Sequence, residues 1–197
     1  MAADPESGQG SAVGYRTDQS PAVELALVPA VAADDGEFVA QIVDLINRVY
    51  AVAEEGLWRD GAERTDAGEV TAIIRAGQLA VATLDGHLAG AVRIQRLDAE
   101  VGEFGMLVAS PEYRGVGIGR ELVAFAEGWA RQQGLSWMQL ELLVPQTWIH
   151  PVKEFLTSWY TRIGYRQVRS GRLAEAYPAL EPLLATPCDF AIYHKHL

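Results

Sequence analysis

The sequence predicts an α/β domain built on a mixed sheet. Segments of strand-like composition alternate with amphipathic segments in the order β-α-α-β-β-β-α-β-α-β-β. Asp85-Gly86 stands between two apolar runs and is a strong signal for an antiparallel hairpin. Later in the chain a helical segment separates two strands, and such a crossover joins parallel strands. Antiparallel and parallel pairs are therefore expected in one sheet.

Apolar periodicity and turn signals place the individual elements. Asp34-Asp35 stands at the N-cap position before an amphipathic run whose apolar residues recur at three- and four-residue steps. Gly134-Leu135 separates the central helix from the strand that follows it. We expect helices over residues 37–52, 69–75, 117–133 and 152–163, strands over 22–31, 78–84, 87–97, 101–109, 137–144, 165–169 and 189–194, and an additional helix or loop over 172–184.

The composition is that of one globular domain. A length of 197 residues allows one domain with a sizeable core, and 49% hydrophobic and 21% charged residues are ordinary for a soluble protein. Residues 1–21 are rich in Gly, Ser, Ala and acidic residues without periodicity, which predicts a disordered tail before a domain over 22–197. No apolar run is long enough to cross a bilayer and no basic-then-apolar leader opens the sequence, so a cytoplasmic location without membrane contact is expected.

The formal net charge is −10, from 26 acidic and 16 basic residues. Such a surface repels DNA and RNA, so no nucleic-acid partner is expected. The same charge attracts a cationic amine, although solubility alone is an equally simple explanation.

Disulfide and metal chemistry are not expected. The single Cys188 has no partner for an internal disulfide, and we interpret it as a small buried residue of a late strand rather than a nucleophile. His87, His150, His194 and His196 do not have the spacing of metal ligands, so the sequence predicts no metal site.

A glycine-rich turn predicts an anion-binding site. Arg114-Gly115-Val116-Gly117-Ile118-Gly119 follows the expected strand over 101–109 and opens the next helix. Residues without side chains let backbone N–H groups approach a phosphate, and the helix dipole adds about half a positive charge there. The turn lacks the Lys-Ser/Thr ending of a P-loop and the glycine spacing of a dinucleotide site. The alternatives are another phosphate ligand or a tight turn that only packs strand on helix.

This turn has the pattern R-x-x-G-x-G and follows Leu107-Val108-Ala109-Ser110-Pro111-Glu112-Tyr113. Both features resemble the pyrophosphate-binding signature of the GNAT superfamily of N-acetyltransferases. The resemblance extends over about residues 22–197 and is strongest over 100–165. It implies the acyl-CoA N-acyltransferase fold, in which a mixed central sheet splays between two parallel strands and carries helices on both faces. It also implies acetyl-CoA as the co-substrate.

The resemblance assigns the coenzyme contacts. The pantetheine arm pairs with backbone at the splay, which corresponds here to Leu107, Val108 and Ala109. The pyrophosphate meets backbone N–H groups of the turn, with Arg114 also near the phosphates. The turn residues concerned are Gly115, Val116, Gly117, Ile118, Gly119 and Arg120.

A second match is Tyr160-Thr161-Arg162-Ile163-Gly164-Tyr165, which resembles the family pattern Y-x-x-x-G-[FY]. The resemblance gives Tyr160 the role of protonating the departing CoA thiolate, a step that a nearby acid assists. The alternative is an aromatic residue on the buried face of its helix. Lys153 departs from the family, since many relatives have Asn at this position.

Two carboxylates are candidates for the base that deprotonates an ammonium substrate. Glu103 occupies a position where several relatives carry a catalytic glutamate, and strand alternation places it on one face with Gly105 and Leu107. Glu141 lies within an apolar strand, where burial raises a carboxyl pKa toward neutrality. Either carboxylate can instead pair with an arginine in a structural role.

Substrate recognition in this superfamily usually involves the first two helices and their connection. Glu54, Glu55, Trp58 and Arg59 lie there and can hold an amine by charge and cation–π contact, or simply form a solvated face around one packed Trp. His150 follows the strand over 137–144 and is either a base near pH 7 or an ordinary surface imidazole.

These features favour an N-acetyltransferase that transfers an acetyl group directly from acetyl-CoA to a primary amine, of a small molecule or of a protein. A non-catalytic acyl-CoA-binding sensor is the alternative from another class, and a nucleotide-binding domain using the same turn is a third. The apolar residues of 172–187 either join two copies in a homodimer or fold back on their own domain.

Overall fold

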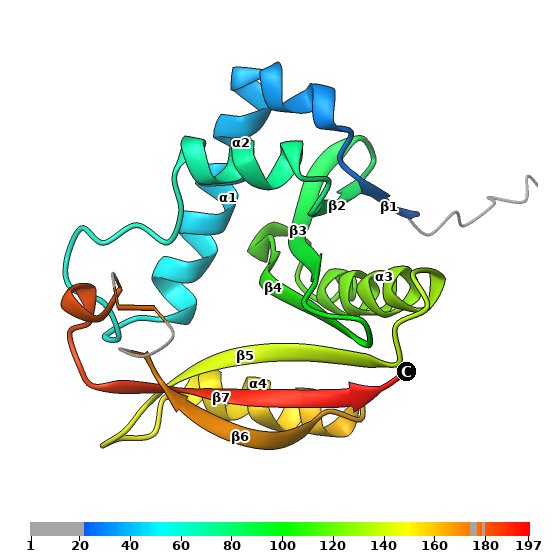
Figure 1. Cartoon of the computed structure of the whole chain (residues 1–197). Coiled ribbons are helices and arrows are strands. Elements are labelled where there is room, and N and C mark those ends of the chain that lie inside the picture. The colour runs from blue at the N-terminus through cyan, green and yellow to red at the C-terminus, as the bar shows by residue number, and fades with distance from the viewer. Residues whose placement is uncertain (1–21, 174–176, 179) are drawn as a thin grey trace, which may run out of the picture.

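The computed structural model describes residues 22–173, 177–178 and 180–197, so the expected disordered tail over 1–21 lies outside the described residues (Figure 1). One mixed sheet has the strand order β1-β2-β3-β4-β5-β7-β6. The strands are β1 (Val23–Leu27), β2 (Leu79–Leu84), β3 (His87–Arg96), β4 (Val101–Ala109), β5 (Trp137–Pro145), β6 (Arg166–Arg172) and β7 (Cys188–His196); the helices are α1 (Gly36–Ala53), α2 (Ala67–Arg75), α3 (Ile118–Gln132) and α4 (Pro151–Arg162), with short 3-10 turns η1 (Ala30–Asp34), η2 (Pro111–Tyr113) and η3 (Glu181–Leu183).

The local signals in the sequence act as expected. Asp85 and Gly86 have φ values of 50° and 79°, the left-handed conformation that a two-residue hairpin turn between β2 and β3 requires. The Asp35 carboxylate accepts the backbone N–H groups of Glu37 and Phe38, each at 3.1 Å, and so caps α1. The predicted hairpin and the predicted N-cap are both confirmed.

Strands β4 and β5 form the parallel pair that the crossover through α3 predicts. They pair only over Val101–Glu103 and Trp137–Gln139, although β4 continues to Ala109 and β5 to Pro145. Beyond these three residue pairs the strands separate. Figure 1 shows β1–β4 and β5–β7 close together near the C terminus and apart at the opposite end. The splayed sheet that the resemblance implied is therefore present.

A β-bulge in β4 begins at Met106, three residues after the pairing with β5 ends. Ala91 of β3 faces Val108 and Arg93 faces Gly105, so that Met106 and Leu107 together oppose one residue of β3. Met106 has a φ of 48°, a conformation that a side chain of this size rarely adopts. The extra residue re-aims the side chains of the strand where it leaves β5.

The bulge overturns one expectation about side-chain direction. Phe104 packs in the core on the α3 side, whereas Met106 and Val108 pack in the core on the α1 side. Leu107 packs against the α3 side, so the prediction that it shares a face with Glu103 and Gly105 was wrong. Regular alternation was assumed, and the inserted residue reverses it.

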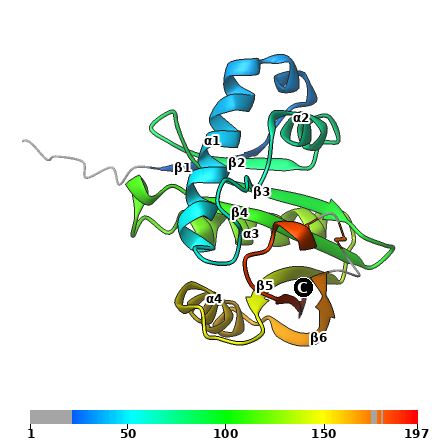
Figure 2. The same ribbon diagram turned by 90° about the vertical axis from the view of Figure 1, so that its left-hand side faces the viewer.

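Helices cover both faces of the sheet. On one face, α1 and α2 bury Ile42, Ile46 and Ile74 against β2–β4. Figure 2 shows both helices over this face of the sheet. On the other face, Leu122 of α3 and Tyr160 of α4 belong to a single core. Apolar periodicity in each helix supplies the face that is buried.

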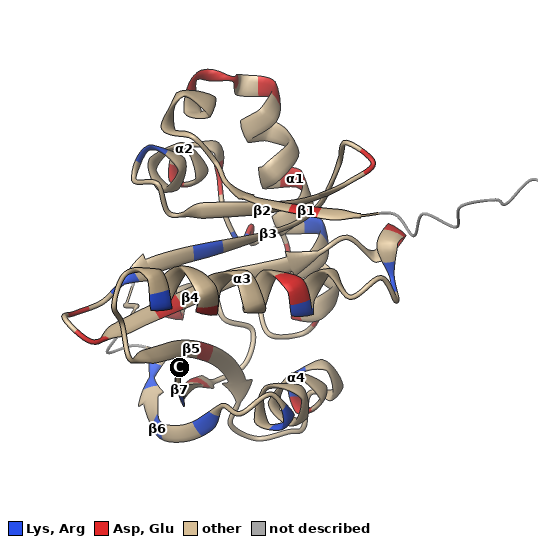
Figure 3. Cartoon of the chain, turned by 90° about the vertical axis from the view of Figure 1, so that its right-hand side faces the viewer, with Lys and Arg blue, Asp and Glu red and all other residues tan. Residues whose placement is uncertain are grey.

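Charged residues are spread over helices, strands and loops of the described chain (Figure 3). Within the described ranges, no helix is both long and apolar enough to span a membrane. In the same ranges, no group of three or more His, Cys, Asp or Glu side chains is placed to hold a metal ion.

Candidate active site

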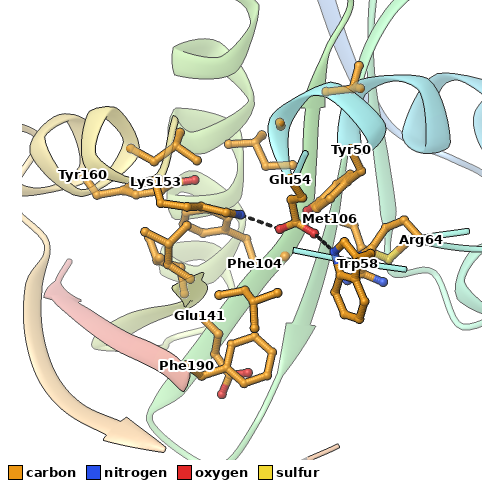
Figure 4. A pocket seen from close by; sticks show the side chains of 18 of the residues that line it. Tyr50, Glu54, Trp58, Arg64, Phe104, Met106, Glu141, Lys153, Tyr160 and Phe190 are labelled. Carbon is orange, nitrogen blue, oxygen red and sulfur yellow. Dashed lines mark hydrogen bonds and ion pairs between the residues drawn. The ribbon is translucent and has the colours of Figure 1, made fainter. Parts of the chain in front are cut away.

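A pocket opens where β4 and β5 separate. A space of about 820 Å³, part of it open solvent, lies between walls from α1, the loop after α1, β4, β5 and α4. Figure 4 shows Tyr160, Glu141 and Lys153 among the side chains around it. Two further cavities adjoin it, one beside the loop after α1 and one next to Glu103. Arg64 and Leu180 line all three cavities, which therefore form neighbouring parts of one cleft.

Tyr160 lies in the wall of this cleft. Its ring packs against Phe104, Trp159 and Tyr165, with ring centroids 6.0, 4.8 and 5.9 Å away. Tyr160 is 5% exposed and lines the pocket, and no described residue bonds its hydroxyl. Burial raises the pKa of Tyr160 well above its usual value, and nearby Tyr50 adds to this. The hydroxyl therefore keeps its proton at neutral pH.

The glycine-rich turn connects the end of β4 to α3. Gly117 is the N-cap of α3 with a φ of 92°, and Gly115 has a φ of 88°. Because Gly117 has no side chain, no side-chain cap occupies the first-turn N–H groups. Arg114, Val116 and Arg120 are exposed around them. The turn thus has the free donors and the positive helix end that an anion needs.

Glu103 is held in place by two amides. The Gln95 side chain donates to one carboxylate oxygen at 2.6 Å, and the Gln139 side chain donates to the other at 3.2 Å. The carboxylate lies in the part of the cleft that also contains Glu141. The sequence allowed Glu103 to pair with an arginine, but in the structure two neutral amides bind its carboxylate instead.

Glu141 lies between the buried Leu140 and Leu142 of β5 and is itself half-buried. Its carboxylate accepts the Tyr177 hydroxyl at 2.9 Å. Burial raises the pKa of the Glu141 carboxyl, the bond from Tyr177 opposes this, and the negative charge of Glu103 reinforces it. A raised pKa agrees with the expectation from its position in an apolar strand.

Four of the five residues expected to bind substrate, all but His150, line one cavity beside the loop after α1. Glu54, however, is buried and forms an ion pair with the equally buried Lys153. The Trp58 indole N–H donates to the second Glu54 oxygen at 2.5 Å (Figure 4). Glu55 and Arg59 are exposed, and Arg59 donates to the Leu184 carbonyl at 3.1 Å. Glu54 is therefore already neutralised by a partner that sequence reasoning missed.

His150 is buried, contrary to the expectation of a surface imidazole. It is the N-cap of α4, where its Nδ1 accepts the backbone N–H of Val152 at 3.2 Å. Its Nε2 lies 3.2 Å from the Glu55 carbonyl, to which the remaining ring proton is donated. Both ring nitrogens are engaged, so His150 joins the start of α4 to the loop after α1 and has no nitrogen free to act as a base.

Two arginines in the cleft were not predicted as site residues. The Arg64 guanidinium lies over the Tyr50 ring, 5.1 Å from its centroid. Arg93 of β3 donates to the side-chain carbonyls of Gln78 and Gln95 at 2.9–3.2 Å. Nothing in the local sequence around Arg64 indicates that it faces the cleft, because its position depends on how the loop after α1 folds.

The fold and the cleft together define an acyltransferase of the acyl-CoA N-acyltransferase fold. The family model for the acetyltransferase (GNAT) family matches residues 39–148, which is more than half of the chain. The chain therefore belongs to the GNAT family and is an acetyl-CoA-dependent acetyltransferase.

Solved structures share this fold at low sequence identity. The PaiA N-acetyltransferase from Thermoplasma acidophilum has a TM-score of 0.65 and 16% identity, over 89% of this chain and 99% of that chain. An acetyltransferase from Streptococcus agalactiae has a TM-score of 0.63 and 18% identity, over 89% and 98%. Ard1 from Thermoplasma volcanium has a TM-score of 0.61 and 11% identity, over 89% and 97%. No curated protein matches the sequence.

Proposed function

We propose that this protein is an N-acetyltransferase that moves the acetyl group of acetyl-CoA directly to a primary amine. One observation carries the proposal: the splay of β4 from β5 and Tyr160 line one pocket, and the glycine-rich turn opens α3 close by, where a Cβ at Gly119 would lie 3.9 Å from Trp159, the neighbour of Tyr160. A coenzyme held by the turn and the splay would bring its thioester toward that hydroxyl.

The turn has the properties of a pyrophosphate cradle. A Cβ placed at Gly115 would meet no atom within 4 Å, so the space above the turn is open to a ligand. The uncapped N–H groups of Ile118 and Gly119 and the positive end of α3 favour a doubly anionic group there. Arg114 and Arg120 add positive charge at the rim. The Thermoplasma acidophilum protein is described in complex with coenzyme A, which supports the same ligand here.

The pantetheine arm is proposed to run along β4 beyond the pairing with β5. From Leu107 to Ala109 the β5-facing edge of β4 has no strand partner. An extended ligand with amide groups can pair with such an edge as an added strand does.

Atoms and protons balance in the proposed transfer. An ammonium acceptor first gives one proton to Glu103 or Glu141. The amine nitrogen then bonds to the acetyl carbonyl carbon, whose oxygen is polarised by backbone N–H groups near the splay. The carbon–sulfur bond breaks with its electron pair on sulfur, and Tyr160 gives its proton to the thiolate. The second proton lost by nitrogen restores Tyr160, and the carboxylate releases its proton to solvent.

Direct transfer is favoured over an acetyl-enzyme intermediate. Cys188 lines a different cavity, and burial raises the pKa of its thiol to about 11, so little nucleophilic thiolate exists at neutral pH. Incubation with acetyl-CoA alone should therefore leave the intact mass of the protein unchanged, whereas an added acetyl group would contradict direct transfer.

The Tyr160→Phe variant tests the catalytic assignment. We expect kcat, measured by thiol release, to fall about 10²–10⁴-fold, because the variant loses the proton donor and keeps the packed ring. The dissociation constant of acetyl-CoA should change little. Unchanged kcat would remove Tyr160 from the mechanism. If wild type binds the coenzyme but turns over no amine, the protein would instead be a non-catalytic acyl-CoA-binding sensor.

A further inference from the structure

Two guanidinium groups line the acceptor side of the cleft. Arg64 lines all three adjoining cavities, and Arg93 lines the one that contains Glu103. Among the described residues, neither arginine has a carboxylate oxygen within 4.0 Å; the partners are the Tyr50 ring for Arg64 and two glutamine amides for Arg93. A partly buried guanidinium usually pairs with an anion, and its planar donors match a carboxylate.

Carboxylates face the same space. Tyr177 donates to Glu141 at 2.9 Å, and burial together with Glu141 and Glu103 raises the pKa of Tyr177 to about 12, while Arg64 acts in the opposite direction. Glu141, Glu103 and Arg64 thus all affect the pKa of the Tyr177 hydroxyl. The cavity has Glu103 and Glu141 on the β4–β5 side and the Arg64 guanidinium at the loop after α1, and Glu69 of α2 also lines it.

Part of the remaining wall of this cavity is apolar, beside the polar Gln95 and Tyr177. Phe104, Met106, Leu180 and Phe190 line it between the carboxylates and Arg64. An acceptor that fills the cavity therefore needs an apolar part in addition to its charged groups.

We propose that the acceptor is an amino acid with an apolar side chain, whose carboxylate is bound by Arg64 and whose amine lies toward Glu103 and Glu141. This inference rests on the proposed acetyl transfer and names its substrate class. A guanidinium fork bonds a carboxylate with two charge-assisted hydrogen bonds.

The same arrangement disfavours other amines. A polyamine would bring a second ammonium group toward Arg64, which is repulsive, and a protein lysine side chain presents no carboxylate near its amine. The net charge of −10 attracts cations to the molecule as a whole, but the groups lining the cleft decide which ligand is retained.

Matched pairs of acceptors test the inference. Thiol release is measured with phenylalanine, leucine and methionine and with the amines that lack their carboxylates, phenethylamine, isopentylamine and 3-(methylthio)propylamine. We expect wild type to prefer an amino acid over its amine by about 100-fold in kcat/KM, and Arg64→Gln to remove about that factor for the amino acid alone. Arg64→Lys should recover part of it. The control Arg48→Gln changes an exposed arginine on α1 and should leave kcat/KM unchanged for the amino acid and for the amine.

A binding measurement separates this inference from the proposed function. Melting temperatures of the CoA-loaded protein are compared with N-acetylphenylalanine and with N-acetylphenethylamine. Stabilisation by the first compound alone, lost in Arg64→Gln, would support carboxylate recognition even if no transfer occurred. Amines used as well as amino acids, or equal stabilisation by both compounds in wild type and Arg64→Gln, would overturn the inference and leave acetyl transfer standing.

Discussion

Burial raises the pKa of Tyr160 and of Glu141 in the cleft, with different consequences for chemistry. The Tyr160 hydroxyl is protonated at neutral pH and so has a proton to give to a leaving thiolate, whereas its raised pKa makes it a weaker acid than an exposed tyrosine. The raised pKa of Glu141 makes its ionised carboxylate a stronger base than an exposed one. Glu103 differs because two amides fix its orientation. A candidate acid, Tyr160, and a candidate base, Glu141, thus stand in one cleft, and burial raises the pKa of both.

The raised pKa of Glu141 has a consequence for stability. An acid with a raised pKa in the folded state binds more protons folded than unfolded, so stability falls as pH rises from the unfolded pKa through the folded one. Glu141→Gln removes this loss. We expect the variant to gain melting temperature over wild type at pH 8 and to gain less at pH 4. The same difference at both pH values, or a loss at pH 8, would show that burial does not destabilise this carboxylate.

At the level of elements, the Glu54–Lys153 pair joins the end of α1 to the start of α4. Both side chains are about 5% exposed, and the two helices belong to opposite faces of the sheet. Lys153→Met would leave the Glu54 carboxylate with only the Trp58 indole. We expect the free energy of unfolding to fall by about 3–5 kcal/mol, as for other buried pairs that lose one partner. Chemical denaturation measures this.

An exposed pair gives the matched comparison. Arg48 bonds Asp44 at 2.7 Å on the surface of α1, where water and salt weaken the attraction. Arg48→Met should therefore cost less than about 1 kcal/mol. If Lys153→Met costs no more than Arg48→Met, the buried pair does not hold the two helices.

The elements themselves were largely predictable from the sequence, because their signals are local. The Asp85-Gly86 turn, the Asp35 cap and the apolar period of α1 fix structure through neighbouring residues. The bulge at Met106 was not predicted, since it depends on how β4 pairs with β3 while it leaves β5. The expected face of Leu107 was wrong for that reason.

The residues of the candidate site also differ in whether the local sequence predicts them. The glycine-rich turn and Tyr160 stand in contiguous motifs, so a family resemblance can locate them. The Lys153 partner, the engaged nitrogens of His150 and the placement of Arg64 in the cleft all involve residues distant in sequence. Lys153 stands seven residues before Tyr160 and therefore on the same face of α4. This spacing was the only local indication that a charged side chain lies beside Tyr160 in the cleft.

For the whole molecule, the cleft divides the sheet into β1–β4 and β5–β7, which pair with each other only over Val101–Glu103 and Trp137–Gln139. A coenzyme bound at the splay would contact both groups of strands. A ligand that binds only the folded state stabilises it by about 2.7 kcal/mol at a hundredfold excess over its dissociation constant. Acetyl-CoA is therefore expected to raise the melting temperature of the whole domain.

The most direct test of this account is the acetyl-CoA-induced shift in melting temperature for wild type, Gly119→Glu and Gly128→Glu. Both glycines lie in α3 with ordinary φ, unlike Gly117. A Cβ at either position would have room, since the nearest atom is 3.9 Å away at Gly119 and none lies within 4 Å at Gly128. Gly119→Glu places a negative charge at the turn. We predict a shift for wild type and Gly128→Glu and none for a folded Gly119→Glu. An equal shift in all three proteins, or none in wild type at millimolar acetyl-CoA, would contradict the coenzyme site.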